Sequence, residues 1–198
     1  MRKLIALVFN YSLNGLLADE GTDYWDFCFD LLDQQGGPDD DDATIGLLQG
    51  AYAHIMGRTA YEGISAGLPA QVDHPWDGIM NAGNKVVFSR TMQTADWANT
   101  TIAAGDTAEE VDRLRLGGEG HILVWGGVSL WRSLMRIDLI DEWHLSMYPY
   151  ITSEGTLLFD DVPKSYGLDL VSSTGKSTGV VELHYRRRRW TGGQSDDV

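Results

Sequence analysis

Short apolar runs alternate with segments of helical period along the chain, and the runs predict the strands of a sheet. We predict strands at residues 3–9, 53–56, 85–88, 100–103, 121–125, 142–150, 167–172 and 180–189. The middle runs are apolar throughout, which is typical of strands that helices cover on both faces. The last three runs follow one another without a helix between them, so we expect antiparallel pairing to close the sheet. The pattern predicts an α/β three-layer domain.

The segment after the first strand contains the clearest helical pattern. Apolar residues recur there at the spacing of one helix face, at Tyr24, Phe27, Cys28, Leu31 and Leu32. Acidic residues occupy another face, at Asp23, Asp26, Asp30 and Asp33. We therefore predict an amphipathic helix at residues 23–33. Two capping-box patterns, "TAYE" at 59–62 and "TAEE" at 107–110, predict two further helix starts, and the second helix should continue through Arg115.

Length and composition indicate one globular domain. The chain has 198 residues, of which 43% are hydrophobic, enough for one sizeable core. We place this domain at residues 1–190 and interpret residues 191–198 as a flexible acidic tail. The start "MRKLIALVF" imitates a signal peptide, but its apolar run ends at Asn10, so we interpret it as a buried strand. No apolar run is long enough for a transmembrane helix, and we expect no membrane partner.

Charge and cysteine content limit which partners and which cellular compartment we expect. The formal net charge is −14, so the surface repels phosphate backbones and we expect no nucleic acid partner. The basic run at 186–189 continues the alternation of the last strand, which favours solvated arginines. The acidic cluster at 36–42 is typical of an exposed loop. The single Cys28 has no partner for an internal disulfide, which fits the reducing cytoplasm.

Two glycines stand between the strand at 121–125 and the helical pattern that follows it. In a mostly parallel sheet, ligands bind beyond the carboxyl ends of the strands, where a helix start offers unpaired N–H groups. Gly126 and Gly127 carry no side chain there, so a pyrophosphate could approach the backbone closely. The simpler interpretation of the pair is a tight turn.

Two further junctions repeat this arrangement. Gly57 and Arg58 follow the strand at 53–56, and Arg58 could offer a forked, charged donor to phosphate. Ser89 and Arg90 follow the strand at 85–88 and add a hydroxyl and a second guanidinium group. An exposed arginine in a surface ion pair is the simpler interpretation of Arg58. The three junctions together favour a phosphate-bearing ligand.

The usual motifs of metal and nucleotide sites are missing from the sequence. The five histidines are scattered singly, at positions 54, 74, 121, 144 and 184, and one cysteine offers no thiolate cluster, so we expect no metal. No G-x-S-x-G, Walker or G-x-G-x-x-G pattern occurs. The dinucleotide interpretation therefore depends on the strand ends and not on a Rossmann signature.

Five motifs, taken in order, resemble the dihydrofolate reductase superfamily. They are "SLNGLLA" (12–18), "MGRTAYE" (56–62), "VVFSRT" (86–91), "VWGGVSL" (124–130) and "DEWHLSMYPYI" followed by "GTLLF" (141–159). The branch they resemble is the C-terminal reductase domain of the bacterial bifunctional riboflavin-biosynthesis deaminase-reductase, over nearly the whole chain. The resemblance implies a mixed sheet of about eight strands, mostly parallel with an antiparallel C-terminal strand. It also implies NADPH bound across the strand ends, and a homodimer.

The resemblance assigns cofactor contacts by motif. Those to the cofactor phosphates would come from Arg58 and Thr59, next to Gly57 as a further cofactor-binding residue, and those to the 2′-phosphate from Ser89 and Arg90. The pyrophosphate and nicotinamide side would be lined by Gly126, Gly127, Val128, Ser129 and Leu130. A flexible loop that closes over the nicotinamide would contain Leu17 and Ala18.

The chain departs from the family pattern in the first two motifs and leaves the acid unassigned. Asn14 replaces the family's usual Asp, and Ala60 replaces a Thr that donates to phosphate. Asp26 and Asp30 lie where dihydrofolate reductases carry an acidic residue, although both also belong to the polar face of the helix at 23–33. Trp25 could form a wall for a planar substrate, or be core. We take Asp26 and Asp30 as candidate catalytic residues, and Asn14 and Trp25 as candidate substrate contacts.

The resulting expectation is an NADPH-dependent reductase that transfers a hydride to a small, heterocyclic substrate such as a pterin, folate or pyrimidine. A second enzyme hypothesis is the riboflavin-pathway 5-amino-6-(5-phosphoribosylamino)uracil reductase itself. Two hypotheses without catalysis are a module that only binds NADPH and a purely structural domain. Thermal stabilisation by NADPH with no turnover would identify the module, and a melting point that no nucleotide moves would identify the structural domain.

Overall fold

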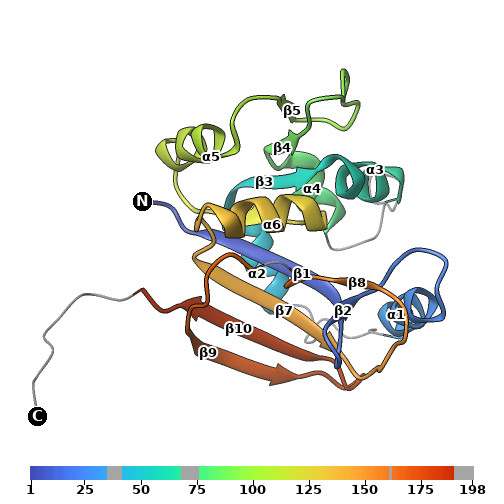
Figure 1. Ribbon diagram of the computed structural model, residues 1–198. Coiled ribbons are helices and arrows are strands. Elements are labelled where there is room, and N and C mark those ends of the chain that lie inside the picture. The colour runs from blue at the N-terminus through green and yellow to red at the C-terminus, as the bar shows by residue number, and fades with distance from the viewer. Residues whose placement is uncertain (35–41, 68–75, 161, 190–198) are drawn as a thin grey trace, which may run out of the picture.

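The computed structural model describes residues 1–34, 42–67, 76–160 and 162–189 (Figure 1). Most of the acidic loop expected at 36–42, and the tail expected at 191–198, lie outside these residues. The chain forms one large sheet with helices on both faces. No helix in the described part of the chain is long and apolar enough to cross a membrane.

The sheet contains all eight strands that the apolar runs predict. Their order across it is β5 (Thr100–Ala103), β4 (Lys85–Phe88), β3 (Ala51–Gly57), β6 (His121–Val124), β1 (Leu4–Ser12), β7 (Glu142–Tyr148), β10 (Val181–Arg187) and β9 (Leu168–Gly175). The pairs from β5 to β7 are all parallel, and β10 is antiparallel to both β7 and β9. The predicted three-layer α/β class, with a mostly parallel sheet and antiparallel pairing at its C-terminal edge, is confirmed.

Two very short strands escape the sequence pattern. β2 (Leu16–Leu17) pairs with β1 and with β8 (Thr156–Leu157), and two residues are too few to show any periodicity. β1 itself continues past the predicted end at Phe9, through an irregularity where Asn10 has a positive φ of 56°. These pairings fasten the segment after β1 to the segment after β7.

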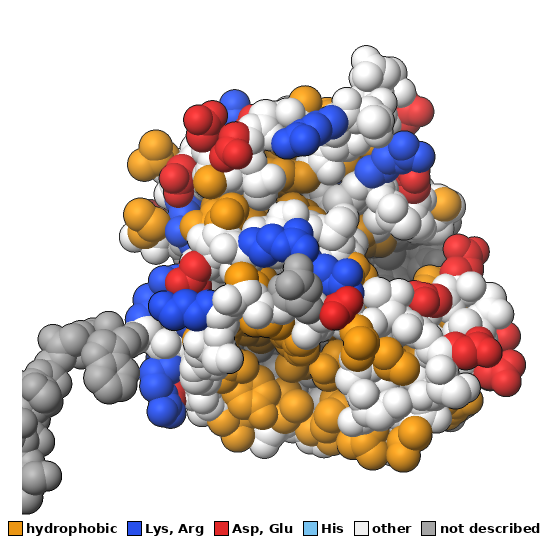
Figure 2. Space-filling model, viewed as in Figure 1, with side chains coloured by type: hydrophobic (Ala, Val, Ile, Leu, Met, Phe, Trp, Pro, Cys, Tyr) orange, Lys and Arg blue, Asp and Glu red, His pale blue; other side chains and the backbone are white. Residues whose placement is uncertain are grey.

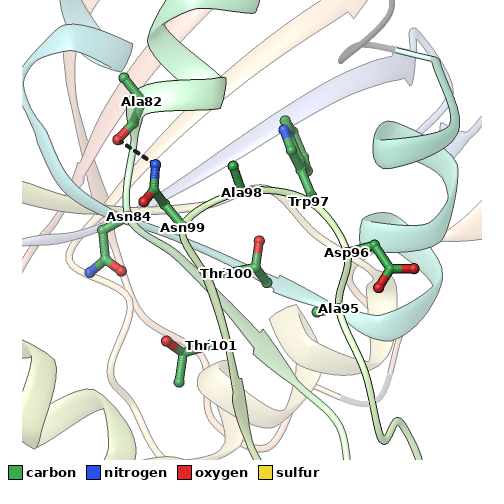
Figure 3. A pocket seen from close by; sticks show the side chains of 9 residues that line it. All are labelled: Ala82, Asn84, Ala95, Asp96, Trp97, Ala98, Asn99, Thr100 and Thr101. Carbon is green, nitrogen blue, oxygen red and sulfur yellow. Dashed lines mark hydrogen bonds between the residues drawn. The ribbon is translucent and has the colours of Figure 1, made fainter.

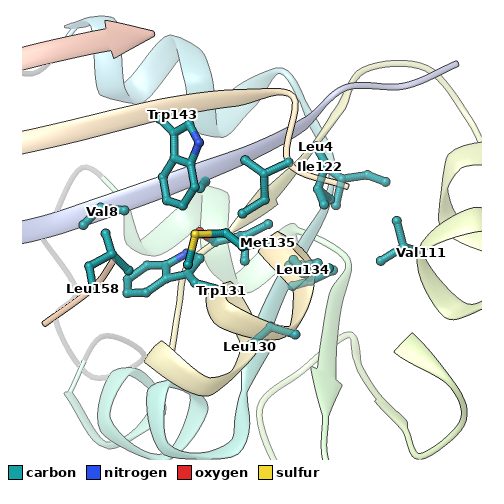
Figure 4. Close-up of a cluster of buried hydrophobic side chains, with 14 of the residues drawn as sticks. Leu4, Val8, Val111, Ile122, Leu130, Trp131, Leu134, Met135, Trp143 and Leu158 are labelled. Carbon is teal, nitrogen blue, oxygen red and sulfur yellow. The ribbon is translucent and has the colours of Figure 1, made fainter. Parts of the chain in front are cut away.

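Six helices cover the sheet in the described part of the chain. They are α1 (Asp23–Gln34), α2 (Asp42–Gln49), α3 (Arg58–Gly67), α4 (Asp77–Ala82), α5 (Thr107–Leu116) and α6 (Val128–Arg136). α5 and α6 pack on one face, in a core that includes Trp131, Leu134 and Trp143 (Figure 4). α2, α3 and α4 pack on the opposite face, around Met56, Met80 and other apolar residues.

Both capping-box predictions place the cap too late, by one residue in α5 and by two in α3. The N-cap of α5 is Asp106, whose carboxylate accepts hydrogen bonds from the backbone N–H groups of Ala108 and Glu109, so Thr107 is the first helical residue. Asp and Thr both suit an N-cap, and the adjacent Asp takes the position. α3 likewise begins at Arg58, which places Thr59 inside the first turn.

Candidate functional site

The three junctions singled out in the sequence meet at one edge of the sheet. The strands β3, β4 and β5 are parallel, and their last residues, Gly57, Phe88 and Ala103, border a cleft of about 350 Å³. We call it the strand-end cleft. Its lining consists of Gly57, Arg58, Thr59, Phe88, Ser89, Arg90, Ala103, Gly105, Thr107, Gly127, Ser129, Leu130 and Ser133.

The two glycines of the β6–α6 junction have different tasks. Gly126 has a φ of +114°, and a Cβ there would lie 2.8 Å from the buried ring of Trp131. Its carbonyl oxygen accepts a 2.7 Å hydrogen bond from the N–H of Gly57, which ties two of the junctions together. Gly127 borders the cleft instead, and a Cβ there would meet no atom within 4 Å. Gly126 therefore builds the turn, and Gly127 leaves the cleft open.

The N-terminus of α6 opens into the strand-end cleft. Gly127 is its N-cap and supplies no side-chain acceptor, although its carbonyl oxygen accepts from the N–H of Leu130 at 2.9 Å. The first N–H groups of a helix have no intrahelical partner, and the helix dipole is positive at this end. Backbone donors at a helix start form a binding site for an anionic group such as phosphate.

Basic and hydroxyl side chains border the same cleft. Arg58 is half-exposed, pairs with Glu62 through Nε at 2.8 Å, and donates to Thr91 Oγ1 at 3.3 Å. The ion pair expected from the simpler interpretation of Arg58 is therefore present, and both partners stay solvent-accessible. Arg90 is exposed. Figure 2 shows basic side chains over the region of β4, β5 and α3, with acidic side chains beside them and over α5, and further acidic side chains around α1.

Ser89 stabilises the turn that presents Arg90. Its Oγ accepts hydrogen bonds from the backbone N–H groups of Met92 at 3.0 Å and Thr91 at 3.3 Å. Its own N–H donates to the carbonyl oxygen of Ala103 at 3.0 Å, which holds the end of β4 against β5. A hydroxyl that accepts both bonds keeps its hydrogen for a ligand.

The first motif is a structural junction and not an open loop. The expectation that Leu17 belongs to a flexible loop is wrong: it lies in β2 and is only 7% exposed. The N–H of Ala18 donates to the carbonyl oxygen of Asn10 at 3.2 Å. Asn14 accepts from the N–H of Thr152 at 3.2 Å and donates to its carbonyl oxygen at 2.9 Å. Their predicted ligand contacts stay predictions.

The candidate catalytic and substrate residues of α1 do not line the strand-end cleft. Asp26 and Asp30 are exposed, as the solvated-face interpretation expects. Trp25 is half-buried and contacts Phe29, with ring centroids 4.8 Å apart. Val128 and Gly126 are also outside the lining; Val128 packs against the core. The roles proposed for these residues remain predictions.

A fourth junction contributes lining residues that the sequence analysis missed. Gly105 lies between β5 and α5, Thr107 is the first residue of α5, and both border the cleft together with Ser133 of α6. The signal was present, because this junction repeats the order of strand end, glycine and helix start. In the sequence, Thr107 was interpreted only as a helix cap. No pattern in the sequence marks Ser133 as a lining residue. In the structure, its Oγ donates to the carbonyl oxygen of Ser129, four residues earlier, at 2.8 Å.

A second hollow, of about 490 Å³, lies at the opposite ends of β4 and β5 (Figure 3). One of its polar residues serves the framework, since Asn99 donates to the carbonyl oxygens of Asn81 and Ala82 at 3.0 and 3.4 Å. The buried Lys85 nearby donates to the carbonyl oxygens of Met80 and Gly83 at 2.6 and 2.8 Å. Ligands of parallel sheets bind at the carboxyl ends of strands, so the strand-end cleft is the better candidate.

Comparisons with known proteins give the family. Residues 3–181 match the RibD C-terminal domain. The uncharacterized protein YyaP of Bacillus subtilis strain 168 is 35% identical over 115 residues, which are 58% of this chain and 58% of YyaP. A candidate riboflavin biosynthesis protein from Shewanella sp. PV-4 is similar in structure, with a TM-score of 0.75, 22% identity, and coverage of 96% of this chain and 100% of that one.

A dihydrofolate reductase from Enterococcus faecalis, complexed with NADP(H), is also similar in structure. The TM-score is 0.59 at 15% identity, over 94% of this chain and 97% of that one. At these identities the solved structures show the fold alone, and the fold is like that of dihydrofolate reductase, as the motifs predict. The family match covers most of the chain, and this chain therefore belongs to the RibD C-terminal domain family.

Proposed function

We propose that this protein is an NADPH-dependent reductase that transfers a hydride to a small heterocyclic substrate such as a pterin, folate or pyrimidine. The observation that carries the proposal is the convergence of an open helix N-terminus, two arginines and a serine hydroxyl on one cleft. Membership of the RibD C-terminal domain family and the likeness to a dihydrofolate reductase complexed with NADP(H) support a reductase.

The residues of the cleft fit a dinucleotide with several phosphates. Gly127 leaves room for a group against the backbone, and the N–H groups at the α6 start would hold the pyrophosphate. Arg58 and Thr59 would contact phosphate from the α3 start. Ser89 and Arg90 would hold the 2′-phosphate, because a hydroxyl and a guanidinium group together favour a dianion. When bound, NADPH would supply the hydride, and the protein would align it with the acceptor.

Isothermal titration of the full chain with NADPH and NADH tests cofactor binding. We expect one saturable NADPH site. Arg90→Ala should weaken NADPH by about tenfold, the loss typical of a charge-assisted hydrogen bond, and should leave NADH almost unchanged. Arg58→Ala should weaken both nucleotides.

Arg113→Ala is the matched control for Arg58→Ala. Arg113 is also an exposed helix arginine with one acidic partner nearby on its helix, Glu110, but it does not border the cleft. The control should bind both nucleotides like the unmodified protein. Absence of NADPH binding, or equal losses in the Arg58 and Arg113 variants, would contradict the proposal.

Substrate screening separates the remaining readings. NADPH consumption with pterins, folates and pyrimidine ribosides would identify a reductase. Growth rescue of a riboflavin auxotroph would identify the riboflavin-pathway 5-amino-6-(5-phosphoribosylamino)uracil reductase, which the family match also supports. The exposure of Asp26 and Asp30 favours, as a second candidate, a module that binds NADPH without turnover. That module would be stabilised by NADPH and inert with every substrate.

A further inference from the structure

Two histidines that lie 40 positions apart in the sequence stack on one face of the sheet. β10 pairs antiparallel with β7 in a register that places His184 opposite His144, and the ring centroids are 3.9 Å apart. Side chains alternate between the faces of a strand, so His144 points away from the core that contains its neighbours Trp143 and Leu145. The pair therefore belongs to the opposite face of the sheet.

Glu142 completes a group of three possible metal ligands on this face. One ligand atom from each of Glu142, His144 and His184 can be chosen so that all three lie within 4.8 Å of one another. Glu142 Oε1 is held by Lys3 Nζ at 2.8 Å and Arg186 Nε at 3.1 Å. Glu142 Oε2 faces His184 Nε2 at 3.2 Å. One carboxylate oxygen is thus fixed by cations, and the other points toward the histidines.

The hydrogen bonding of His144 is incomplete. Its Nε2 is buried and makes no hydrogen bond to any residue in the described part of the chain. Buried ring nitrogens are normally paired, and each unpaired one calls for an explanation. The His184 side chain is 19% exposed, so an ion from solvent can reach the group.

We propose that Glu142, His144 and His184 bind a divalent transition-metal ion of the Zn²⁺ type. Two imidazoles and one carboxylate are a typical ligand set for Zn²⁺, with a fourth position left to water. Metal–ligand bonds of about 2 Å place tetrahedral ligand atoms roughly 3.4 Å apart. Glu142 Oε2 and His184 Nε2 are already that close, and separations of up to 4.8 Å to the third ligand atom must shorten by about an ångström. Rotation of the Glu142 and histidine side chains supplies that movement. Lys3 and Arg186 orient the carboxylate, as partners of metal ligands commonly do.

The site is separate from the strand-end cleft. Glu142 is the first residue of β7, whereas the cleft lies at the carboxyl ends of the parallel strands. A metal here would link β7 to β10, the antiparallel pair that attaches the C-terminal edge of the sheet. Its role would be to fasten the two strands, and binding to the folded state would raise the melting temperature.

Zinc titration of the full chain, after removal of metal with a chelator, tests the proposal. We expect one equivalent of Zn²⁺ to bind saturably and to raise the melting temperature. Co²⁺ should give the visible absorption of a four-coordinate ion with nitrogen and oxygen ligands. His144→Ala, His184→Ala and Glu142→Gln should each lower the zinc affinity by at least about tenfold.

Glu182→Gln is the matched control for Glu142→Gln. Glu182 lies on the same face of the sheet, opposite Ser146, and is not one of the three ligands. This variant should bind zinc like the unmodified protein. His144→Phe and His184→Phe keep a planar ring in the stack but cannot ligate, so they decide the matter if an alanine variant fails to fold. A folded double phenylalanine variant that binds one zinc normally, or an unmodified protein that shows no saturable site, would overturn the proposal.

Discussion

The parallel half of the sheet and its antiparallel edge use polar residues in opposite ways. At the carboxyl ends of β3, β4 and β5, polar side chains such as Arg58 and Arg90 stay open to solvent. Across β7 and β10, the polar side chains engage one another, and buried Glu142 carries contacts from Lys3, Arg186 and His184. The difference suggests that the first region is built to receive a ligand of substantial size. The second could hold nothing larger than an ion.

Replacing each glycine of the β6–α6 junction tests whether Gly126 mainly supports folding and Gly127 mainly leaves room for the ligand. Gly126→Ala should cost about 2–4 kcal/mol of folding free energy, because it combines a positive φ with overlap against the Trp131 ring. Gly127→Ala should cost less than about 1 kcal/mol, because its methyl group meets open space. Its methyl group should instead weaken NADPH binding. Urea denaturation and nucleotide titration measure the two effects, and equal stability losses would refute the division.

Acid should destabilise the protein in two pH windows, of which the upper involves both halves and the lower involves only the antiparallel edge. Burial, then the nearby charge of Lys85, lowers the pKa of His54 in β3 from 6.5 to about 4. The unfolded chain therefore takes up the proton first, and stability present above pH 6.5 falls as the pH drops toward 4. The largest loss from this group is on the order of 3 kcal/mol. Neutral His144 in β7 also contributes folding stability that is lost in the same window, because burial and the charge of His184 lower its pKa from 6.5 to about 4.

Glu142 acts in a lower window. Burial acts to raise its pKa, but hydrogen bonds from Lys3, Arg186 and His184 outweigh burial and lower it from 4.5 to about 2. The stability from this ionised carboxylate is complete above pH 4.5 and is lost as the pH falls toward 2, again by on the order of 3 kcal/mol.

Denaturation at a series of pH values separates these contributions. His54→Asn keeps an acceptor for the Trp125 indole N–H, which donates to His54 Nδ1 at 2.9 Å, but does not titrate. This variant should show a smaller change in stability between pH 6.5 and 4. Glu142→Gln should flatten the curve below pH 4.5 only. If His54→Asn leaves the upper slope unchanged, His54 is not protonated on unfolding.

The smallest expected effect concerns the turn after β4. Ser89→Ala removes the acceptor for the N–H groups of Thr91 and Met92 and should cost about 1 kcal/mol of stability. The same variant should reduce the preference for NADPH over NADH. A calorimetric melt and a nucleotide titration measure both changes, with Ser65→Ala, in α3 and outside the cleft lining, as the control. A stability loss with an unchanged preference for NADPH over NADH would mean that Ser89 stabilises the turn but does not contact the 2′-phosphate.

The same contrast explains what the sequence could reveal. A strand end and the helix start after it are neighbours in the chain, so Gly57 with Arg58, and Ser89 with Arg90, were recognisable before their convergence was known. His144 and His184 meet only through strand register, which single-sequence patterns do not fix. The resemblance alone placed Leu17 in a loop; it lies in β2, whose two residues are too few to show periodicity, and its side chain packs in the core. Helix starts were uncertain by one residue where Asp106 and Thr107 compete for the same cap.

Asn14 illustrates how an amide side chain can connect two segments of the chain in a way that a carboxylate would not. It both gives and receives a hydrogen bond at Thr152, and it also accepts one from the Ser12 hydroxyl at 3.0 Å. A carboxylate at this position could still receive, but it would face the Thr152 carbonyl oxygen with negative charge against negative dipole. Asn14→Asp would therefore weaken the connection between the two segments, because the donor to the Thr152 carbonyl oxygen would be lost.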